Sequence, residues 1–325
     1  MINILHGADL HLDSPFSDFP AGTAAMCREE QRQILRRLRS VCIQRQSHVM
    51  LLAGDIFDGI PYPETVELLR RELALSPVPV FIVPGNHDPL ESGLWDGEWP
   101  EHVHIFKGPG CVTLEELGLC VHHGDLPGLR GRDDGYIHIG LIHGDEPFTE
   151  KEIAATGLDY LALGHIHKTA MPRRAGKTWY GWPGIPMGRG FDETGFKGVF
   201  SVELSRERCD AELIGFGLMR CEIYHVDVSE DWKPPRDSSR ICARVYLVGN
   251  AGQTDAETFY ETYAGEFLRL EVKDETTPQE DLWEACGDGT LRGLALDRVK
   301  ACEDGALAEL AAKYLLAALE GREAP

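Results

Sequence analysis

Aspartate, asparagine and histidine residues recur directly after short apolar stretches in the first half of the chain. They fall in five motifs: Asp9 and His11 in ADLH, Asp55 and Asp58 in GDIFD, Asn86, His87 and Asp88 in GNHD, His143 in IHGD, and His165 and His167 in GHIH. A mixture of imidazole, carboxylate and amide groups suits divalent manganese, iron or zinc. Each motif alone is common by chance, but the whole series predicts a metal centre.

The chemistry that fits this set is phosphoester hydrolysis with two metal ions. Two divalent ions about 3.5–4 Å apart share a bridging carboxylate and keep open positions for water and substrate. Asp55 is the natural bridge, and hydroxide activated by both ions would attack phosphorus. His87 stands beside a ligand without being needed as one, so we expect it to protonate the leaving alkoxide or to stabilise the transition state.

Short apolar strands must position these groups. Apolar runs at residues 2–6, 48–53, 80–83, 136–142 and 159–163 each end where one of the motifs begins. Helical patterns at about residues 24–46, and from Pro63 to just before Pro77, alternate with the first strands. This alternation predicts an α/β layered domain. Ligands bind at the carboxyl ends of strands in such sheets, so we expect the five motifs to face one crevice.

The series of motifs resembles the calcineurin-like metallophosphoesterases, over about residues 1–205. The resemblance implies a four-layer α/β/β/α sandwich with a two-metal site on one edge. It also implies which side chains hold each ion: Asp9, His11, Asp55 and His167 for one, and Asp55, Asn86, His143 and His165 for the other. By the same resemblance, His87 is the catalytic histidine.

Two further stretches resemble a particular branch of that family. HGADLHLDSPF and GWPGIPMGRGFDETGFKGV are similar to bacterial DNA-repair exonucleases related to the nuclease subunit of SbcCD. The resemblance implies manganese-dependent exonuclease and endonuclease cleavage of DNA, an SbcC-like ATPase partner, and a capping domain after the catalytic core. The pattern of strand-like and helical stretches changes near residues 216–222. We therefore predict a phosphoesterase domain at 1–218 and a smaller α+β capping domain at 219–325. A homodimer is left open.

The charge of the chain argues in a different direction from the DNA prediction. The formal net charge is −21, and residues 222–325 hold 11 Lys and Arg against 22 Asp and Glu, a net of −11. A strongly acidic protein repels polyanions at long range. The charge therefore favours an alternative, a phosphodiesterase or phosphatase for small or nucleotide substrates. A second alternative is a non-catalytic metal-binding scaffold for a partner ATPase. The intact ligand set and the presence of His87 argue against it.

Several charged residues outside the ligand set have two interpretations each. We expect Asp58 and Asp88 to orient histidines or backbone around the site. Arg189, in a glycine-rich loop, either holds a substrate phosphate or pairs with Asp192 or Glu193. The helix at about residues 24–46 either meets a DNA backbone or presents a solvated face. Its basic residues are Arg28, Arg32, Arg36, Arg37, Arg39 and Arg45.

Cysteine usage and hydropathy bear on the compartment. The nine cysteines are odd in number and include no C-x-x-C pair. They predict free thiols in a reducing cytosol rather than a disulfide framework or zinc ribbon. No apolar run approaches the roughly 18 residues of a membrane span, and the N-terminus lacks the basic region of a signal peptide. We therefore expect a cytoplasmic protein with no membrane association.

Overall fold

The structure is a computed structural model that describes residues 1–144, 148–251, 255–278 and 282–321. The chain divides into two compact units. The first comprises Met1–Tyr224, Lys233–Val245 and Tyr260–Glu271, and the second comprises His225–Trp232, Tyr246–Phe259 and Val272–Pro325. The expected boundary between residues 218 and 219 stays a prediction.

The first unit contains a six-stranded sheet that begins with the N-terminal strand. Its strands are β1 (Ile2–Gly7), β2 (Val49–Ala53), β3 (Val80–Val83), β4 (Val103–Ile105), β11 (Val199–Leu204) and β12 (Cys209–Ile214). Their order is β12-β11-β1-β2-β3-β4, with β1 to β4 parallel and β11 antiparallel to β1. Two helices accompany it, α1 (Ala21–Gln44) and α2 (Pro63–Ala74). Proline stands at the first position of α2, where its missing N–H costs no hydrogen bond.

The same unit contains a second six-stranded sheet. Its strands are β5 (Gly110–Leu114), β6 (Leu119–His123), β7 (Ile137–His143), β8 (Tyr160–Gly164), β9 (Ala170–Ala175) and β10 (Thr178–Trp182). Their order is β5-β6-β7-β8-β10-β9, and β5 and β9 form the antiparallel edges. The helix α3 (Glu150–Thr156) begins with a capping box between Thr149 and Glu152, which satisfies backbone donors at its N-terminus.

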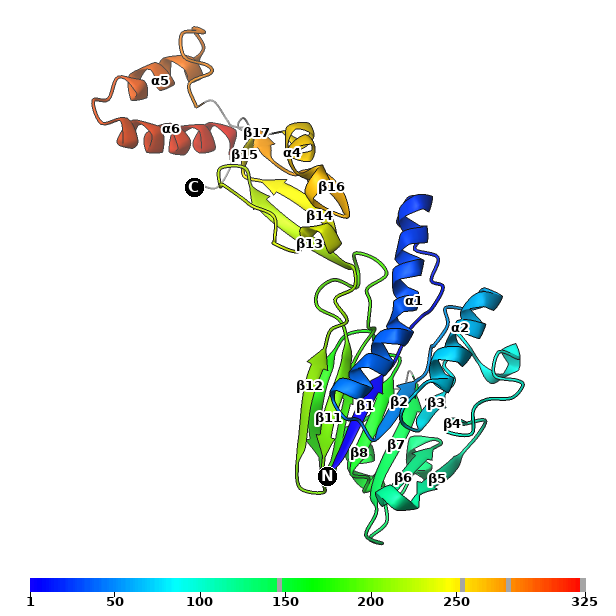
Figure 1. The fold of residues 1–325 in the computed structure, drawn as a ribbon. Coiled ribbons are helices and arrows are strands. Elements are labelled where there is room, and N and C mark those ends of the chain that lie inside the picture. The colour runs from blue at the N-terminus through cyan, green and yellow to red at the C-terminus, as the bar shows by residue number, and fades with distance from the viewer. Residues whose placement is uncertain (145–147, 252–254, 279–281, 322–325) are drawn as a thin grey trace. The chain divides into compact units, whose positions relative to one another are not determined.

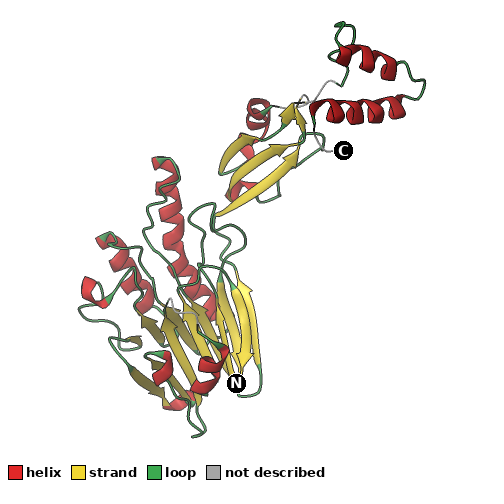
Figure 2. Ribbon diagram, turned by 180° about the vertical axis from the view of Figure 1, so that it is seen from behind, coloured by secondary structure: helices red, strands yellow, loops and turns green. Residues whose placement is uncertain are grey.

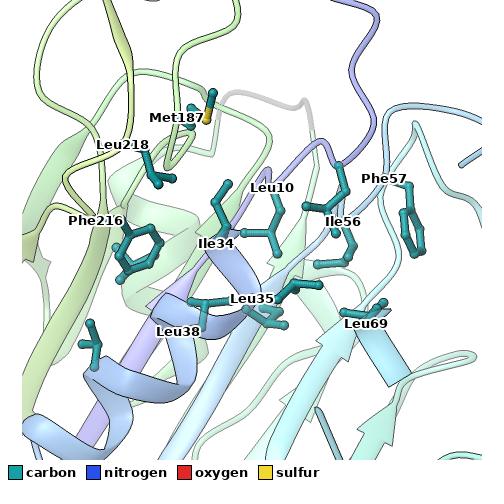
Figure 3. Close-up of a cluster of buried hydrophobic side chains, with 14 of the residues drawn as sticks. Leu10, Ile34, Leu35, Leu38, Ile56, Phe57, Leu69, Met187, Phe216 and Leu218 are labelled. Atoms are coloured by element: carbon teal, nitrogen blue, oxygen red, sulfur yellow. The ribbon is translucent and has the colours of Figure 1, made fainter. Parts of the chain in front are cut away.

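Buried side chains show that the two sheets stack face to face with helices outside them (Figures 1 and 2). Ile4 and Phe81 of the first sheet share one core with Val121 and Leu141 of the second. On the outer face of the first sheet, α1 and α2 bury a second core. Its members include Leu10, Ile34, Leu35, Leu38, Ile56, Phe57, Leu69, Met187, Phe216 and Leu218 (Figure 3).

A third core lies on the opposite side of the sandwich. Ile153 of α3 packs there with Leu161 of β8 and Tyr180 of β10. The first sheet is therefore covered on both faces, and the outer face of the second sheet is covered around β8 and β10. The order of layers is helix, sheet, sheet, helix, and the expected four-layer α/β/β/α fold is confirmed.

The last third of the chain contains smaller elements. They are β13 (Arg220–Asp227), β14 (Ile241–Val248), β15 (Asn250–Ala251), α4 (Ala256–Tyr263), β16 (Arg269–Asp274), β17 (Thr277–Pro278), α5 (Leu291–Lys300) and α6 (Gly305–Glu320). β13, β14 and β16 form one sheet, and β15 pairs with β17. Leu296 of α5 packs against Ala312 and Leu316 of α6. Residues 282–287 form turns.

Short 3₁₀ helices complete the fold at Leu90–Ser92, Glu115–Leu117, Leu126–Gly128, Ser238–Arg240 and Ala264–Glu266. In the part of the chain that the structure describes, no helix has both the length and the apolar character of a membrane span.

Candidate metal centre

The seven expected ligands come from the ends of strands in both sheets. Asp9, His11, Asp55 and Asn86 follow β1, β2 and β3 of the first sheet, whereas His143 ends β7 and His165 and His167 follow β8 of the second. They meet because the stacked sheets present these ends on the same side of the sandwich. His143 Nδ1 donates to the backbone oxygen of Ala53 across the two sheets at 2.8 Å. The crevice is thus shared between two sheets rather than formed by one.

Two glycines allow the approach that this geometry needs. A Cβ at Gly164, the last residue of β8, would lie 1.8 Å from the carbonyl oxygen of Ala53. A Cβ at Gly85 would lie 2.0 Å from Oδ1 of Asp55. Any larger residue would push β8 away from β2, or would displace the Asp55 carboxylate. The glycines before the motifs therefore serve close packing at these two positions.

The loops that carry the ligands hold a strained backbone. Asp9, His11, Asp55 and His165 have φ angles of 53°, 45°, 49° and 83°. Such left-handed conformations cost of order 1 kcal/mol or more for residues with a Cβ, and they gather at functional sites. Backbone bonds maintain them, since Asp9 N donates to Gly54 O at 3.0 Å and His11 N donates to Asp55 O at 2.9 Å.

One group of potential ligands consists of Asp9, His11 and His167. One ligand atom from each lies within 4.8 Å of the others. The Nε2 atoms of His11 and His167 are 3.0 Å apart. The carboxylate of Asp9 is buried and accepts the backbone N–H of His165 at 2.9 Å. Burial, opposed by the nearby His143, raises the pKa of Asp9 to about 6.

A second group consists of Asp55, His143 and His165, and its ligand atoms also lie within 4.8 Å of one another. Oδ1 of Asn86 lies 2.9 Å from His143 Nε2 and 3.0 Å from His165 Nδ1. Oδ2 of Asp55 lies 3.3 Å from His143 Nε2 and 3.7 Å from His11 Nε2. The Asp55 carboxylate therefore stands between the two groups, as a bridging ligand must.

The protonation pattern of the histidines fits divalent cations. His143 donates from Nδ1 to Ala53 O, so in its neutral form Nε2 carries a lone pair that faces the Asn86 oxygen. His167 Nδ1 lies 2.7 Å from Glu193 Oε1, which leaves Nε2 of His167 as the lone pair facing His11. Lone pairs that face one another repel unless a proton or a cation lies between them. This donor set therefore fits two divalent metal ions.

His87 lies beside the first group and is held by Asp58. Its Nδ1 is 2.9 Å from Asp58 Oδ1, and its ring meets the His11 ring edge-on with centroids 4.8 Å apart. Asp58 also accepts the Ser14 hydroxyl at 2.8 Å and Arg189 at 3.2 Å. Burial works to raise the pKa of Asp58, but the His11 ring, the Ser14 hydroxyl and Arg189 outweigh it and hold that pKa well below the usual range. Asp58 thus remains an anion that fixes the His87 ring.

Asp88 acts on backbone rather than on histidines. Its Oδ2 accepts the N–H groups of Ile56 and Phe57 at 2.7 and 3.1 Å, and its Oδ1 accepts that of Gly85 at 2.7 Å. The side chain is fully buried, and this burial raises its pKa to about 6. Asp88 therefore ties the loop after β2 to the loop after β3, which carry Asp55 and Asn86.

Glu193 joins the site, although the sequence predicted it only as a partner for Arg189. Its Oε1 lies 2.7 Å from His167 Nδ1 and accepts Arg189 at 2.8 Å. Burial opposes ionisation, but His167 and Arg189 outweigh it and hold the pKa of Glu193 below its usual range. The guanidinium of Arg189 thus bridges Glu193 and Asp58. The sequence feature that could have identified Glu193 is an acidic residue four positions after Arg189, within the glycine-rich loop that follows the last ligand.

Comparison with known proteins identifies the family of this chain. The family described as calcineurin-like phosphoesterase matches residues 2–169. The uncharacterized metallophosphoesterase YhaO of Bacillus subtilis (strain 168) is 28% identical, over 87% of this chain and 80% of that protein. The SbcD component of the nuclease SbcCD from the same organism is 25% identical, over 60% of this chain and 64% of that component. The solved structure of TT1561 from Thermus thermophilus aligns with 65% of this chain and 98% of its own, at 12% identity and a TM-score of 0.40.

Proposed function

Since this chain belongs to the calcineurin-like phosphoesterase family, a metal-dependent phosphoesterase family, we propose that it is a phosphodiester hydrolase acting on DNA. The observation that carries the proposal is the position of Asp55, which stands between two groups of ligands with His87 beside them. Asp9, His11, Asp55 and His167 would hold one ion, and Asp55, Asn86, His143 and His165 the other. We propose manganese as the resident metal, with iron or zinc as alternatives.

When bound, the two ions supply Lewis-acid activation of water and neutralise charge at phosphorus. The protein supplies a proton donor and its orientation. With Nδ1–H directed at the Asp58 carboxylate, His87 keeps Nε2 for substrate and can pass a proton from Nε2 to the departing oxygen. The contact with Asp58 fixes the orientation of the His87 ring. Arg189 is proposed to contact a substrate phosphate from its place between Asp58 and Glu193.

The DNA substrate rests on sequence likeness to the SbcD component of SbcCD. The same likeness supports an SbcC-like ATPase as a partner and DNA repair as the setting, and a homodimer remains compatible with it. Residues 219–325 are proposed to form a capping domain.

The charge distribution favours a second candidate, a phosphodiesterase or phosphatase for small or nucleotide substrates. The arginines of α1 would be the natural contacts to a DNA backbone, yet several are paired with carboxylates. Arg32 binds Asp13 at 2.8 Å, and Arg39 and Arg36 bind Glu72 at 3.2 and 3.4 Å. An arginine that is paired with a carboxylate attracts a polyanion less strongly. The net charge of −21 adds long-range repulsion.

One assay separates these candidates. The purified protein with manganese is offered end-labelled duplex and single-stranded DNA, bis-p-nitrophenyl phosphate and cyclic nucleotides, at low and moderate salt. Cleavage of DNA that weakens with salt supports the nuclease. Turnover of the small esters with inert DNA supports the second candidate. A His87→Ala variant, with His225→Ala as an exposed histidine control, tests for a non-catalytic scaffold, whose behaviour His87→Ala would leave unchanged.

A further inference from the structure

A second cluster of metal-ligand residue types lies outside the two-metal centre. One ligand atom each of Cys111, Cys120 and His122 lies within 4.8 Å of the others. Cys111 pairs with His122 and Thr113 pairs with Cys120 across the antiparallel strands β5 and β6. The alternate residue Val121 faces the core between the sheets, so the cluster occupies the opposite, outward face of the second sheet.

The imidazole of His122 is prepared as a ligand. Its Nε2 lies 2.8 Å from Nδ1 of His138, whose Nε2 lies 2.9 Å from Oδ1 of Asp134. The carboxylate can only accept, so His138 donates from Nε2 and accepts on Nδ1, and His122 therefore donates from Nε2. This leaves Nδ1 of His122 with its lone pair.

The two cysteines differ in exposure, and the buried one lies beside a hydroxyl group. Cys120 is buried and lies 3.1 Å from the hydroxyl of Thr113, which can donate to a thiolate. Cys111 is exposed and gives the site access to solvent. Both are free thiols. A hydrogen-bonded sulfur, a solvent-facing sulfur and an oriented imidazole form a soft ligand set with an open side.

The strand register argues against a disulfide between these cysteines. They are diagonal neighbours, since each is paired with a residue two positions from the other. Diagonal positions are roughly 7–8 Å apart, whereas disulfides usually need Cα atoms within about 6.8 Å. A metal ion between the two sulfurs spans a longer gap than a direct bond.

We propose that Cys111, Cys120 and His122 form a binding site for a zinc-class divalent ion, with a fourth position open to water. Two thiolates and one imidazole select zinc over the magnesium or manganese that oxygen-rich sites prefer. The site shares no residue with the two-metal centre, where no cysteine occurs among the seven ligands. Because β5 is an edge strand of its sheet, the ion would also fasten this strand to β6.

Cobalt(II) provides the test, because sulfur coordination gives a near-ultraviolet charge-transfer band that oxygen and nitrogen ligands do not. Metal-free, fully reduced protein is titrated with cobalt(II). We expect a sulfur-to-cobalt band that reaches a plateau once cobalt exceeds the capacity of this site and the two-metal centre together, and that zinc displaces. Cys111→Ser and Cys120→Ser should each abolish or strongly reduce the band, whereas Cys302→Ser, which removes another exposed cysteine, should retain it. An Asp55→Asn variant should also retain it, which separates this site from the catalytic centre.

A measurement on the unaltered protein guards against variants that misfold. Iodoacetamide labelling of Cys111 should slow several-fold when zinc is present, while labelling of Cys302 should not change. A reduced wild-type protein without the charge-transfer band would overturn the proposal. So would a band that persists in both single-cysteine variants, or a rate of Cys111 labelling that zinc leaves unchanged.

Discussion

The proposed two-metal centre and the proposed Cys111–Cys120–His122 site are built in different ways within one sandwich. The centre joins loops from both sheets, and four of its residues have positive φ angles that neighbouring backbone must maintain. The cysteine site uses two adjacent strands in regular antiparallel register. One site offers oxygen and nitrogen ligands, the other sulfur and nitrogen. The first depends on how the sheets stack, and the second on how one hairpin pairs.

Different structural changes should therefore disturb each site. A change that shifts one sheet against the other should disturb the two-metal centre and leave the cysteine site in place. A change confined to β5 or β6 should do the reverse. The two sites should therefore fail independently of each other.

Removal of Asp55, the proposed bridging carboxylate, should have the largest effect. In an Asp55→Asn variant we expect phosphodiester hydrolysis to fall to background, because both groups of ligands lose their shared anion. Manganese binding, measured by equilibrium dialysis, should weaken at both positions. The sulfur-to-cobalt band should persist, and Cys120→Ser should show the converse pattern of full hydrolysis without the band. Loss of both properties in either variant would contradict the independence of the two sites.

Loss of His87, the proposed catalytic histidine, should reduce turnover while the metals stay bound. For His87→Ala we expect kcat to fall by about 10²–10⁴-fold, the usual contribution of general acid catalysis. Manganese stoichiometry should match that of the wild type, because His87 is expected not to be a ligand. Asp58→Asn should lower kcat by a smaller factor, since it removes only the anion that orients His87. A lower manganese stoichiometry in His87→Ala than in the wild type would show that His87 acts as a metal ligand instead.

Glu193 should affect metal affinity more than the chemical step. Its carboxylate fixes the His167 ring at 2.7 Å, and partners that orient metal ligands contribute about 10–100-fold in affinity. For Glu193→Gln we therefore expect manganese affinity to fall by about 10–100-fold, with kcat near that of the wild type at saturating manganese. Glu203→Gln, on an exposed position of β11, is the matched control. Unchanged manganese affinity in Glu193→Gln would reject this role.

The stacking of the sheets should also depend on pH through His6. His6 of β1 is buried, and its Nδ1 lies 3.0 Å from the hydroxyl of Tyr160 in β8. Burial lowers the pKa of His6 from 6.5 to about 3. Below pH 6.5 the unfolded chain therefore binds a proton that the folded chain does not. The stability from neutral His6 is fully present above pH 6.5 and is lost as the pH falls toward 3.

We expect this linkage to remove about 2 kcal/mol from the free energy of unfolding between pH 7 and pH 5. Urea unfolding of metal-free wild-type and His6→Gln protein at both pH values measures it. The Gln variant should show a loss smaller by about that amount, because it lacks the titrating ring. Identical pH dependence in the two proteins would mean that His6 does not carry the effect.

Much of the local structure follows from the sequence. The strand expected at residues 80–83 coincides with β3, because a short run of β-branched and aromatic residues between prolines has few other conformations. The five motifs at strand ends, and the resemblance to calcineurin-like phosphoesterases, were likewise visible in the chain itself. These signals are local, since a few neighbouring residues carry each of them.

Only the tertiary structure assigned β1 to β3 and β7 to β8 to separate stacked sheets, because sheet membership depends on contacts between residues far apart in the chain. For the same reason, no sequence motif predicted the contact between Glu193 and His167. The strand β5 lacks a clear apolar alternation, since it lies at an exposed edge, so Cys111 read as an isolated free thiol. Its approach to Cys120 and His122 depends on the hairpin register, which is seen once β5 and β6 are paired.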